Sequence, residues 1–149
     1  MADEWRSNSF VIPQFNARIS AISQSESIRG LRHYQYRPDL IVIDDVEDLE
    51  SVKTREGRDK VWNWFSGEVM QIGDINTKIV IIGNLLQEDS LMMRLKENIG
   101  AGKMDGIYKE YPLLDKNDTI AWLGKYPSMM HIETKRRQVA DESAWYREY

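Results

Sequence analysis

The fold of this chain is indicated most strongly by LIVIDD at residues 40–45, where four apolar residues are followed by two acids. Pro38 and Asp39 precede the run, and its length and β-branched content are typical of a short strand. A continuous apolar strand predicts burial on both faces, as in a parallel sheet. Such a strand ends at the carboxyl edge of the sheet, where ligands bind in open α/β folds. We therefore expect a strand that presents two carboxylates at that edge.

The residues around this stretch predict alternating strands and helices. Thr54 can cap a helix whose apolar residues recur at positions 61, 65, 69 and 72, and Gly73 can end it. KIVII at 78–82 predicts a second buried strand, and Asp89 or Ser90 can cap a helix that stops at Gly100. The other expected elements are a hairpin (9–12 and 16–22), a loop (23–38), a third strand (104–111), irregular chain (115–130) and a charged helix (132–148). This order favours one α/β domain over residues 1–149, with a parallel sheet flanked by helices.

Composition narrows the classes of function. The 149 residues are 42% hydrophobic and 30% charged, which is ordinary for a soluble globular protein, and no apolar run predicts a membrane span. The chain has no cysteine, which excludes disulfides and thiolate metal sites, and its two histidines are far apart. The net charge of −4 differs from the basic surface typical of DNA-binding proteins. Basic residues gather only at 29–37 and 135–137, and both groups could equally be solvated surface.

The two acids at the end of the first strand have the Walker B form. A carboxylate at Asp44 could hold Mg²⁺ directly or through water, and Asp45 could orient or deprotonate an attacking water. The alternative is that both acids merely cap the loop after the strand. Glu47, Asp48 and Glu50 extend the acidic stretch and could join a metal site, although solvated loop charge is the simpler interpretation.

Three further features allow more than one interpretation. Asn84 follows the second strand, where it could contact a γ-phosphate or simply form a turn with Gly83. GAGK at 100–103 resembles the end of a P-loop, but it follows a helix and lacks the motif's first glycine and its final Ser or Thr, so a helix stop is favoured. The five tryptophans could stack on nucleic-acid bases, but their spacing favours packing within the protein.

The order of these segments resembles the large terminase subunits of tailed phages, over the second half of their ATPase domain. The most specific part is RPDLIVIDD at 37–45, which looks like the family's approach to Walker B. The other matching segments are SIRG (27–30), RDKVWNWF (58–65), the strand and turn at 79–84 with QEDSL (87–91) and RL (94–95) after it, and AWYREY (144–149).

The resemblance implies a partial P-loop NTPase sheet of the RecA/ASCE class and roles for four residues. Asp44 would be the Walker B acid associated with Mg²⁺, and Asp45 the catalytic carboxylate that activates water. Many family members carry Glu at the position of Asp45. Asn84 would occupy the coupling position that senses the nucleotide, where the family often has Thr or Ser. Arg29 would match an arginine that in some terminases reaches the ATP of a neighbouring subunit.

The resemblance also implies that these residues are part of a larger motor that packages viral DNA with Mg²⁺ and ATP. A Walker A loop is expected upstream of Met1 and a nuclease domain downstream of Tyr149. Without the Walker A groups, we expect no ATP hydrolysis by these 149 residues alone. The implied partners are double-stranded DNA, the portal protein, the small terminase subunit and further copies of the chain, with no membrane. The implied location is the cytoplasm of the host bacterium.

Two other functions fit the sequence. One is a non-catalytic assembly or binding module that keeps a P-loop-type sheet, which the lack of a Walker A loop in these residues favours. The other is a helicase-like P-loop module, in which the Asp44-Asp45 pair would also fit. In P-loop sheets of this class, the coupling strand separates the Walker A and Walker B strands. We therefore expect residues 104–111, or a second copy of the chain, to cover the open side of residues 78–82.

Overall fold

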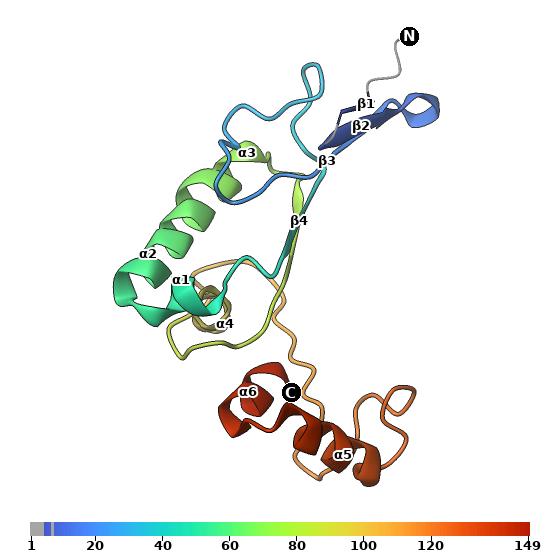
Figure 1. The fold of residues 1–149 in the computed structure, drawn as a ribbon. Coiled ribbons are helices and arrows are strands. Elements are labelled where there is room, and N and C mark those ends of the chain that lie inside the picture. Colours follow the sequence, from blue (N-terminus) through green and yellow to red (C-terminus); the bar gives the residue numbers. More distant parts are fainter. Residues whose placement is uncertain (1–4, 7) are drawn as a thin grey trace. The chain divides into compact units, whose positions relative to one another are not determined.

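The computed structural model describes residues 5–6 and 8–149, and the chain forms two compact units. The N-terminal unit comprises residues 1–46 and 55–82, and the C-terminal unit comprises residues 47–54 and 83–149. Figure 1 traces the chain through both units. Each unit has its own elements, and each is described separately below.

The elements alternate between strands and helices, as predicted. The N-terminal unit contains β1 (Trp5–Arg6), β2 (Ser9–Ile12), η1 (Pro13–Phe15), β3 (Ala17–Ser20), β4 (Leu40–Asp44), α2 (Arg55–Trp64), the π-helical η2 (Phe65–Val69), α3 (Met70–Ile72) and β5 (Lys78–Ile82). The C-terminal unit contains α1 (Leu49–Lys53), α4 (Leu91–Gly100), α5 (Met129–Val139) and α6 (Glu142–Glu148).

The predicted N-terminal hairpin is confirmed. Strands β2 and β3 pair antiparallel, and β1 adds a third strand on the other side of β2. Pro13 opens the turn η1, and Asn16 closes it with a φ of 48°. Asparagine tolerates this left-handed conformation better than most residues, so the turn residues explain where the hairpin reverses.

Strands β4 and β5 form a separate two-stranded parallel sheet. Leu40 aligns with Lys78 and Asp44 with Ile82. The backbone N–H of Lys78 donates to the Asp39 carbonyl (2.9 Å), and the N–H of Asp45 donates to the Ile82 carbonyl (3.1 Å). Hydrogen bonds therefore extend the ladder by one residue of β4 at each end.

The side chain of Thr77 sets where β5 begins. Its hydroxyl donates to the Pro38 carbonyl (2.6 Å) and accepts from the N–H of Asp74 (2.8 Å). Gly73 ends the preceding helix, and a Cβ atom there would lie 2.8 Å from the Thr77 side chain. Glycine is therefore required at position 73 by close approach, and Thr77 connects the end of the helix to the start of β4.

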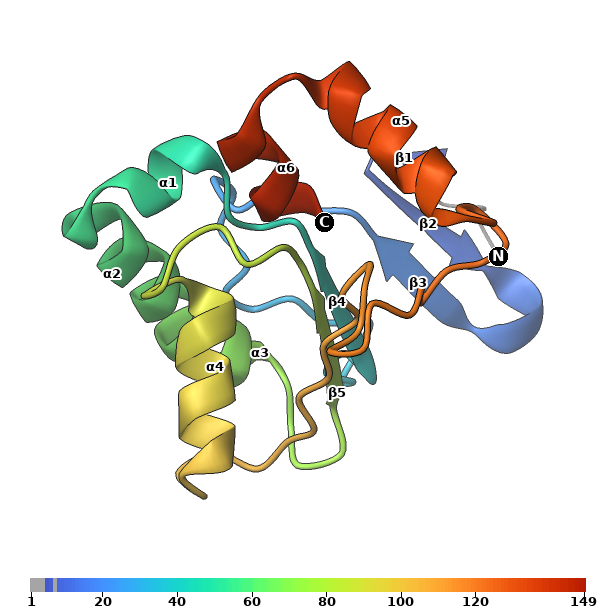
Figure 2. The ribbon, with the colours of Figure 1, turned by 90° about the horizontal axis from the view of Figure 1, so that it is seen from below.

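The helical segment α2–η2–α3 carries the apolar stripe that its spacing predicts. It lies along one side of β4 and β5 (Figure 1; Figure 2). The stripe is buried and consists of Val61, Phe65, Val69 and Ile72. Ile43 of β4 is also buried, so the core of this unit lies between the helix and one face of the sheet.

The prediction that both strands are buried on two faces is wrong. Along each strand, more exposed and less exposed residues alternate. The face opposite the buried one exposes Leu40 (57%), Val42 (56%), Val80 (45%) and Ile82 (54%). Within the described part of the N-terminal unit, helices cover one face of this sheet, so the continuous apolar sequence did not indicate burial on both faces.

The predicted third strand at 104–111 is also wrong, because these residues form neither a strand nor a helix. In the described part of the chain, β5 pairs with β4 alone. The segment contains Gly106 and three charged residues and lacks a run of β-branched residues. Ile107, Tyr108 and Tyr111 therefore favour a strand only weakly, and the segment does not pair with a strand in the tertiary structure.

The C-terminal unit has an aromatic core near the end of the chain. Tyr126, Ile132 and Trp145 are buried, with Tyr149 and smaller aliphatic side chains packed around them. The rings of Trp145 and Tyr149 stack with centroids 4.3 Å apart. The segment expected to form one helix over 132–148 is divided into α5 and α6, because Ala140 takes a left-handed φ of 56° and Asp141 caps α6. The break brings both helices onto the aromatic core.

No helix among the described residues combines the length and apolar character needed to cross a membrane.

We expect Thr77→Val to lower the free energy of unfolding by about 1–3 kcal/mol, because it keeps the β-branched shape but removes the hydroxyl that bonds Pro38 and Asp74. Urea unfolding followed by circular dichroism measures the change. Thr77→Ser, which retains the hydroxyl, should lose clearly less. An equal loss of unfolding free energy in the two variants would contradict a stabilising role for the hydrogen bonds of the Thr77 hydroxyl.

Candidate functional site

Asp44 and Asp45 lie at the carboxyl end of β4, as predicted. Both are exposed, and Asp44 is in register with Ile82, the last residue of β5. Asp45 has a φ of 44°, a left-handed conformation that few residues other than glycine adopt and that aspartate tolerates. The chain therefore turns out of the strand at Asp45, directly after the last ladder hydrogen bond. Two carboxylates are left accessible at the edge where parallel sheets bind ligands.

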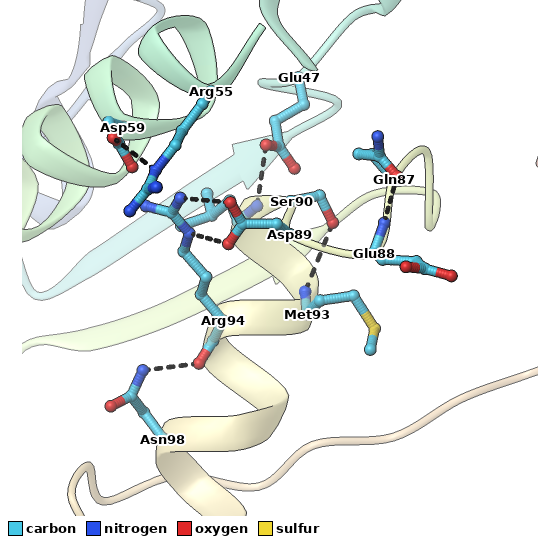
Figure 3. Close-up of polar contacts among 11 residues, drawn as sticks. Glu47, Arg55, Asp59, Gln87, Glu88, Asp89, Ser90, Met93, Arg94 and Asn98 are labelled. Carbon is cyan, nitrogen blue, oxygen red and sulfur yellow. Dashed lines mark hydrogen bonds and ion pairs between the residues drawn. The ribbon is translucent and has the colours of Figure 1, made fainter. Parts of the chain in front are cut away.

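The following acids have a different role from these two. A carboxylate oxygen of Glu47 accepts a hydrogen bond from the backbone N–H of Leu91 (2.8 Å), at the start of α4 (Figure 3). A carboxylate at a helix N-terminus satisfies an otherwise unpaired N–H and interacts favourably with the helix dipole. The interpretation of Glu47 as solvated loop charge is therefore corrected, and its hydrogen bond to α4 gives it a structural role.

Asp48 is the N-cap of α1, a helix that was not predicted from the sequence. Its side chain accepts from the Ser51 N–H (2.7 Å), and the Ser51 hydroxyl accepts from the Asp48 N–H (2.9 Å). The hydrogen bond from the Ser51 N–H lowers the pKa of Asp48, so the cap stays charged at neutral pH and weakens only as the pH falls through that lowered value. The signal that could have revealed α1 is the spacing of Asp48 and Ser51, a variant of the capping box.

The start of α4 is built from residues that the terminase resemblance singles out. Ser90 is fully buried, and its hydroxyl accepts from the Met93 N–H (3.5 Å), which confirms Ser90 as the cap. Asp89 and Arg94 form a bidentate pair, with two nitrogen–oxygen distances of 2.8 Å (Figure 3). A planar guanidinium held at two points is well oriented. The contacts that the structure shows for Asp89, Ser90 and Arg94 therefore stabilise the start of the helix.

Asn84 is exposed in the C-terminal unit, two residues after β5. Its side-chain amide donates to a carboxylate oxygen of Glu148 in α6 (3.1 Å). This hydrogen bond uses the side-chain NH₂ group of Asn84 and leaves its amide oxygen as an acceptor. The candidate coupling residue is thus connected to the last helix of the chain.

Arg29 lies in the loop between β3 and β4, next to the buried side chain of Ile28. Gly30 follows with a φ of 81°, so the loop turns sharply at this point. The side chain of Arg29 is 74% exposed and lies 3.7 Å from the Glu68 carboxylate in η2. Such an exposed pair contributes little to stability, about 0–1 kcal/mol, so Arg29 is free to exchange partners.

A polar groove lies between this loop and the helix. Its walls include Ser25, Glu26, Arg29, Lys60 and Glu68. The adjoining η2 is π-helical, a feature found often at functional sites. The groove places Arg29 beside a mixture of charges, and its ion-pair partner there is Glu68 rather than Asp44 or Asp45.

The donor chemistry of the strand edge fits Mg²⁺. No group of three or more metal-binding His, Cys, Asp or Glu side chains occurs among the described residues. Mg²⁺ commonly takes one or two protein carboxylates and completes its shell with water and substrate phosphates. Asp44 and Asp45 are the exposed carboxylates at this edge that could hold such an ion.

Comparisons with models of known protein families, with curated proteins and with solved structures find no match to this chain.

We expect Glu47→Ala to destabilise the protein by about 1 kcal/mol, because the N–H of Leu91 at the start of α4 loses its charged acceptor. Chemical denaturation measures the effect. Glu50→Ala is the matched control, since the side chain of Glu50 is 85% exposed and forms a surface ion pair with Lys53. A loss of the same size in the control would contradict a specific role for Glu47.

Proposed function

We propose that this chain is the Walker B half of the ATPase domain of a phage large terminase, the motor subunit that packages viral DNA. The observation that carries the proposal is the parallel, in-register pairing of β4 with β5, which ends in Asp44 opposite Ile82. A Walker B acid has to stand at the carboxyl end of a sheet strand beside the strand that leads to the coupling residue. The order of Asp44, Asp45 and Asn84 along the chain meets that requirement.

In this proposal the two acids divide the chemistry. Asp44, at the strand end, holds Mg²⁺ directly or through water, and the metal supplies charge neutralisation on the phosphates when bound. Asp45 accepts a hydrogen bond from the attacking water and orients it. Aspartate is one methylene shorter than the glutamate common at this position. The left-handed turn at Asp45 changes the direction of the chain at the point where the shorter side chain has to reach the water.

Arg29 and Asn84 act outside this pair of acids. Arg29 is exposed and weakly held by Glu68, which suits a residue that reaches the nucleotide of a neighbouring subunit. Asn84 bonds Glu148 of α6, so a change at the nucleotide would be passed to the last helix of the chain. The proposed partners are double-stranded DNA, the portal protein, the small terminase subunit and further copies of the chain. The proposed location is the cytoplasm of the host bacterium.

A non-catalytic assembly module is the second candidate. The aliphatic side chains exposed on one face of the β4–β5 sheet favour it, because such a face is typical of a surface that another protein segment covers. The two functions differ in whether Asp44 affects ATP turnover.

We expect residues 1–149 alone to show no ATP hydrolysis, and a version extended upstream by a P-loop segment to hydrolyse ATP. Asp44→Asn should abolish that turnover, because the metal loses a carboxylate. Asp39→Asn, directly before the opposite end of β4, is the matched control and should remain active. A coupled phosphate-release assay measures both. Turnover by the unextended chain that Asp44→Asn removes, or an active Asp44→Asn in the extended chain, would refute the proposal.

Arg29→Ala in the extended, assembled protein should lower kcat on the order of 10³-fold, as expected for a residue that stabilises charge on the transferring phosphoryl group. Arg32→Ala, an exposed arginine of the same loop, should leave kcat nearly unchanged. Mixing Arg29→Ala with Asp45→Asn subunits tests whether Arg29 acts on a neighbour. Mixed assemblies should regain part of the activity, whereas action within one subunit predicts no recovery.

A further inference from the structure

The outer edge of β5 carries backbone groups that pair with no strand of the described chain. In a parallel strand, the N–H and C=O of one residue point to the same side, and successive residues alternate. The N–H of Lys78 and the C=O of Ile82 both bond β4. The groups of Ile79 and Ile81 therefore point away from β4. In the described residues no strand lies on that side of β5.

This edge also lacks the features that usually prevent edge-to-edge pairing. Proteins protect exposed edges with proline, bulges and charged side chains within the strand. β5 contains four aliphatic residues and one charge, Lys78, at its first position. It contains no proline, and its register with β4 has no bulge. In contrast, β4 ends in Asp44 and begins directly after Pro38 and Asp39.

We propose that a second copy of this chain pairs with β5 through this edge, in antiparallel orientation about a two-fold axis at Val80. With that register, Ile79 of one copy faces Ile81 of the other, and each pair exchanges two backbone hydrogen bonds. All four outward-pointing N–H and C=O groups of each copy are then satisfied. Two parallel two-stranded sheets become one four-stranded sheet.

Side-chain chemistry favours this register. Lys78 of each copy lies opposite Ile82 of the other, so the only charges of the strand are kept apart. Val80 faces its own counterpart in a non-hydrogen-bonded pair, where side chains are closest. The pairing also shields part of the exposed aliphatic surface of Val80 and Ile82. A two-fold interface of this kind uses the same patch on both copies and closes at a dimer.

The inference does not depend on the proposed function. The proposed dimer uses the outer edge of β5, where the Walker A strand would lie in a complete ATPase sheet. The dimer and the completed sheet therefore exclude each other. Failure of ATP turnover in the extended chain would leave the dimer of the 149-residue chain unaffected.

The test uses single-cysteine variants, because the chain has no cysteine of its own. Val80→Cys should form a disulfide-linked dimer under oxidised glutathione, since its two Cα atoms would lie about 4.5 Å apart, within the range that a disulfide spans. Val42→Cys is the matched control, because Val42 is in register with Val80 and similarly exposed. It lies on β4, one strand further from the proposed two-fold axis. Its Cα atoms would lie three strand spacings apart, about 14 Å, which no disulfide bridges.

Non-reducing electrophoresis measures the fraction of disulfide-linked dimer, and circular dichroism checks that both variants fold. Cross-linking of Val80→Cys with little or none of Val42→Cys supports edge pairing. Comparable cross-linking of both would indicate packing of the exposed faces and overturn the proposal. Absence of cross-linking in a folded Val80→Cys, or a wild-type chain that sediments as a monomer at high micromolar concentration, would also overturn it.

A second pair of variants keeps the proposal testable if Val80→Cys fails to fold. An equimolar mixture of Lys78→Cys and Ile82→Cys should cross-link, because these positions face each other in the proposed register. Neither variant should cross-link by itself. Cross-linking of either variant alone, or none in the mixture, would contradict the register.

Discussion

The site and the sheet edge both depend on one constraint, the register between β4 and β5. A parallel pair cannot be set by a tight turn, because its strands are joined by a long crossover. Here the hydroxyl of Thr77 bonds the Pro38 carbonyl just before β4, and the ladder then runs from Lys78 to the hydrogen bond between Asp45 and Ile82. A shift by one residue would exchange the two faces of β5 and move the end of β4 relative to it. The position of Asp44 is therefore a consequence of contacts made at the opposite end of the strands.

The acidic stretch after β4 divides into two groups with different physical roles. Asp44 and Asp45 remain accessible at the sheet edge, whereas Glu47 and Asp48 bond the backbone N–H groups of helices α4 and α1. Helix N-termini attract carboxylates because their first N–H groups have no partner within the helix. Glu47 and Asp48 therefore have structural partners of their own, and the described residues contain no group of three or more acids placed to hold a metal. A pair of carboxylates suits a cation that completes its shell with water and phosphate.

The β4–β5 sheet carries more aliphatic surface than the N-terminal unit covers. Its helices lie on one side, and Leu40, Val42, Val80 and Ile82 are exposed on the other. A strand that needed only one buried face would alternate apolar and polar residues, as antiparallel strands with one solvated face commonly do. The apolar sequence of both strands therefore leaves an aliphatic face that the described helices of the N-terminal unit do not cover.

The sequence by itself determined the features that depend on neighbouring residues. The helical stripe from Val61 to Ile72, the turn at Asn16, the Ser90 cap and the strand that ends in Asp44 were all predictable, because spacing and turn chemistry act locally. Only the tertiary structure showed that one sheet face is exposed, that residues 104–111 do not pair, and that Glu47 bonds α4. It also showed that Ala140 divides the last helix and that Arg29 pairs with Glu68. These outcomes depend on which distant groups lie within reach, and residue spacing along the chain carries no information about that.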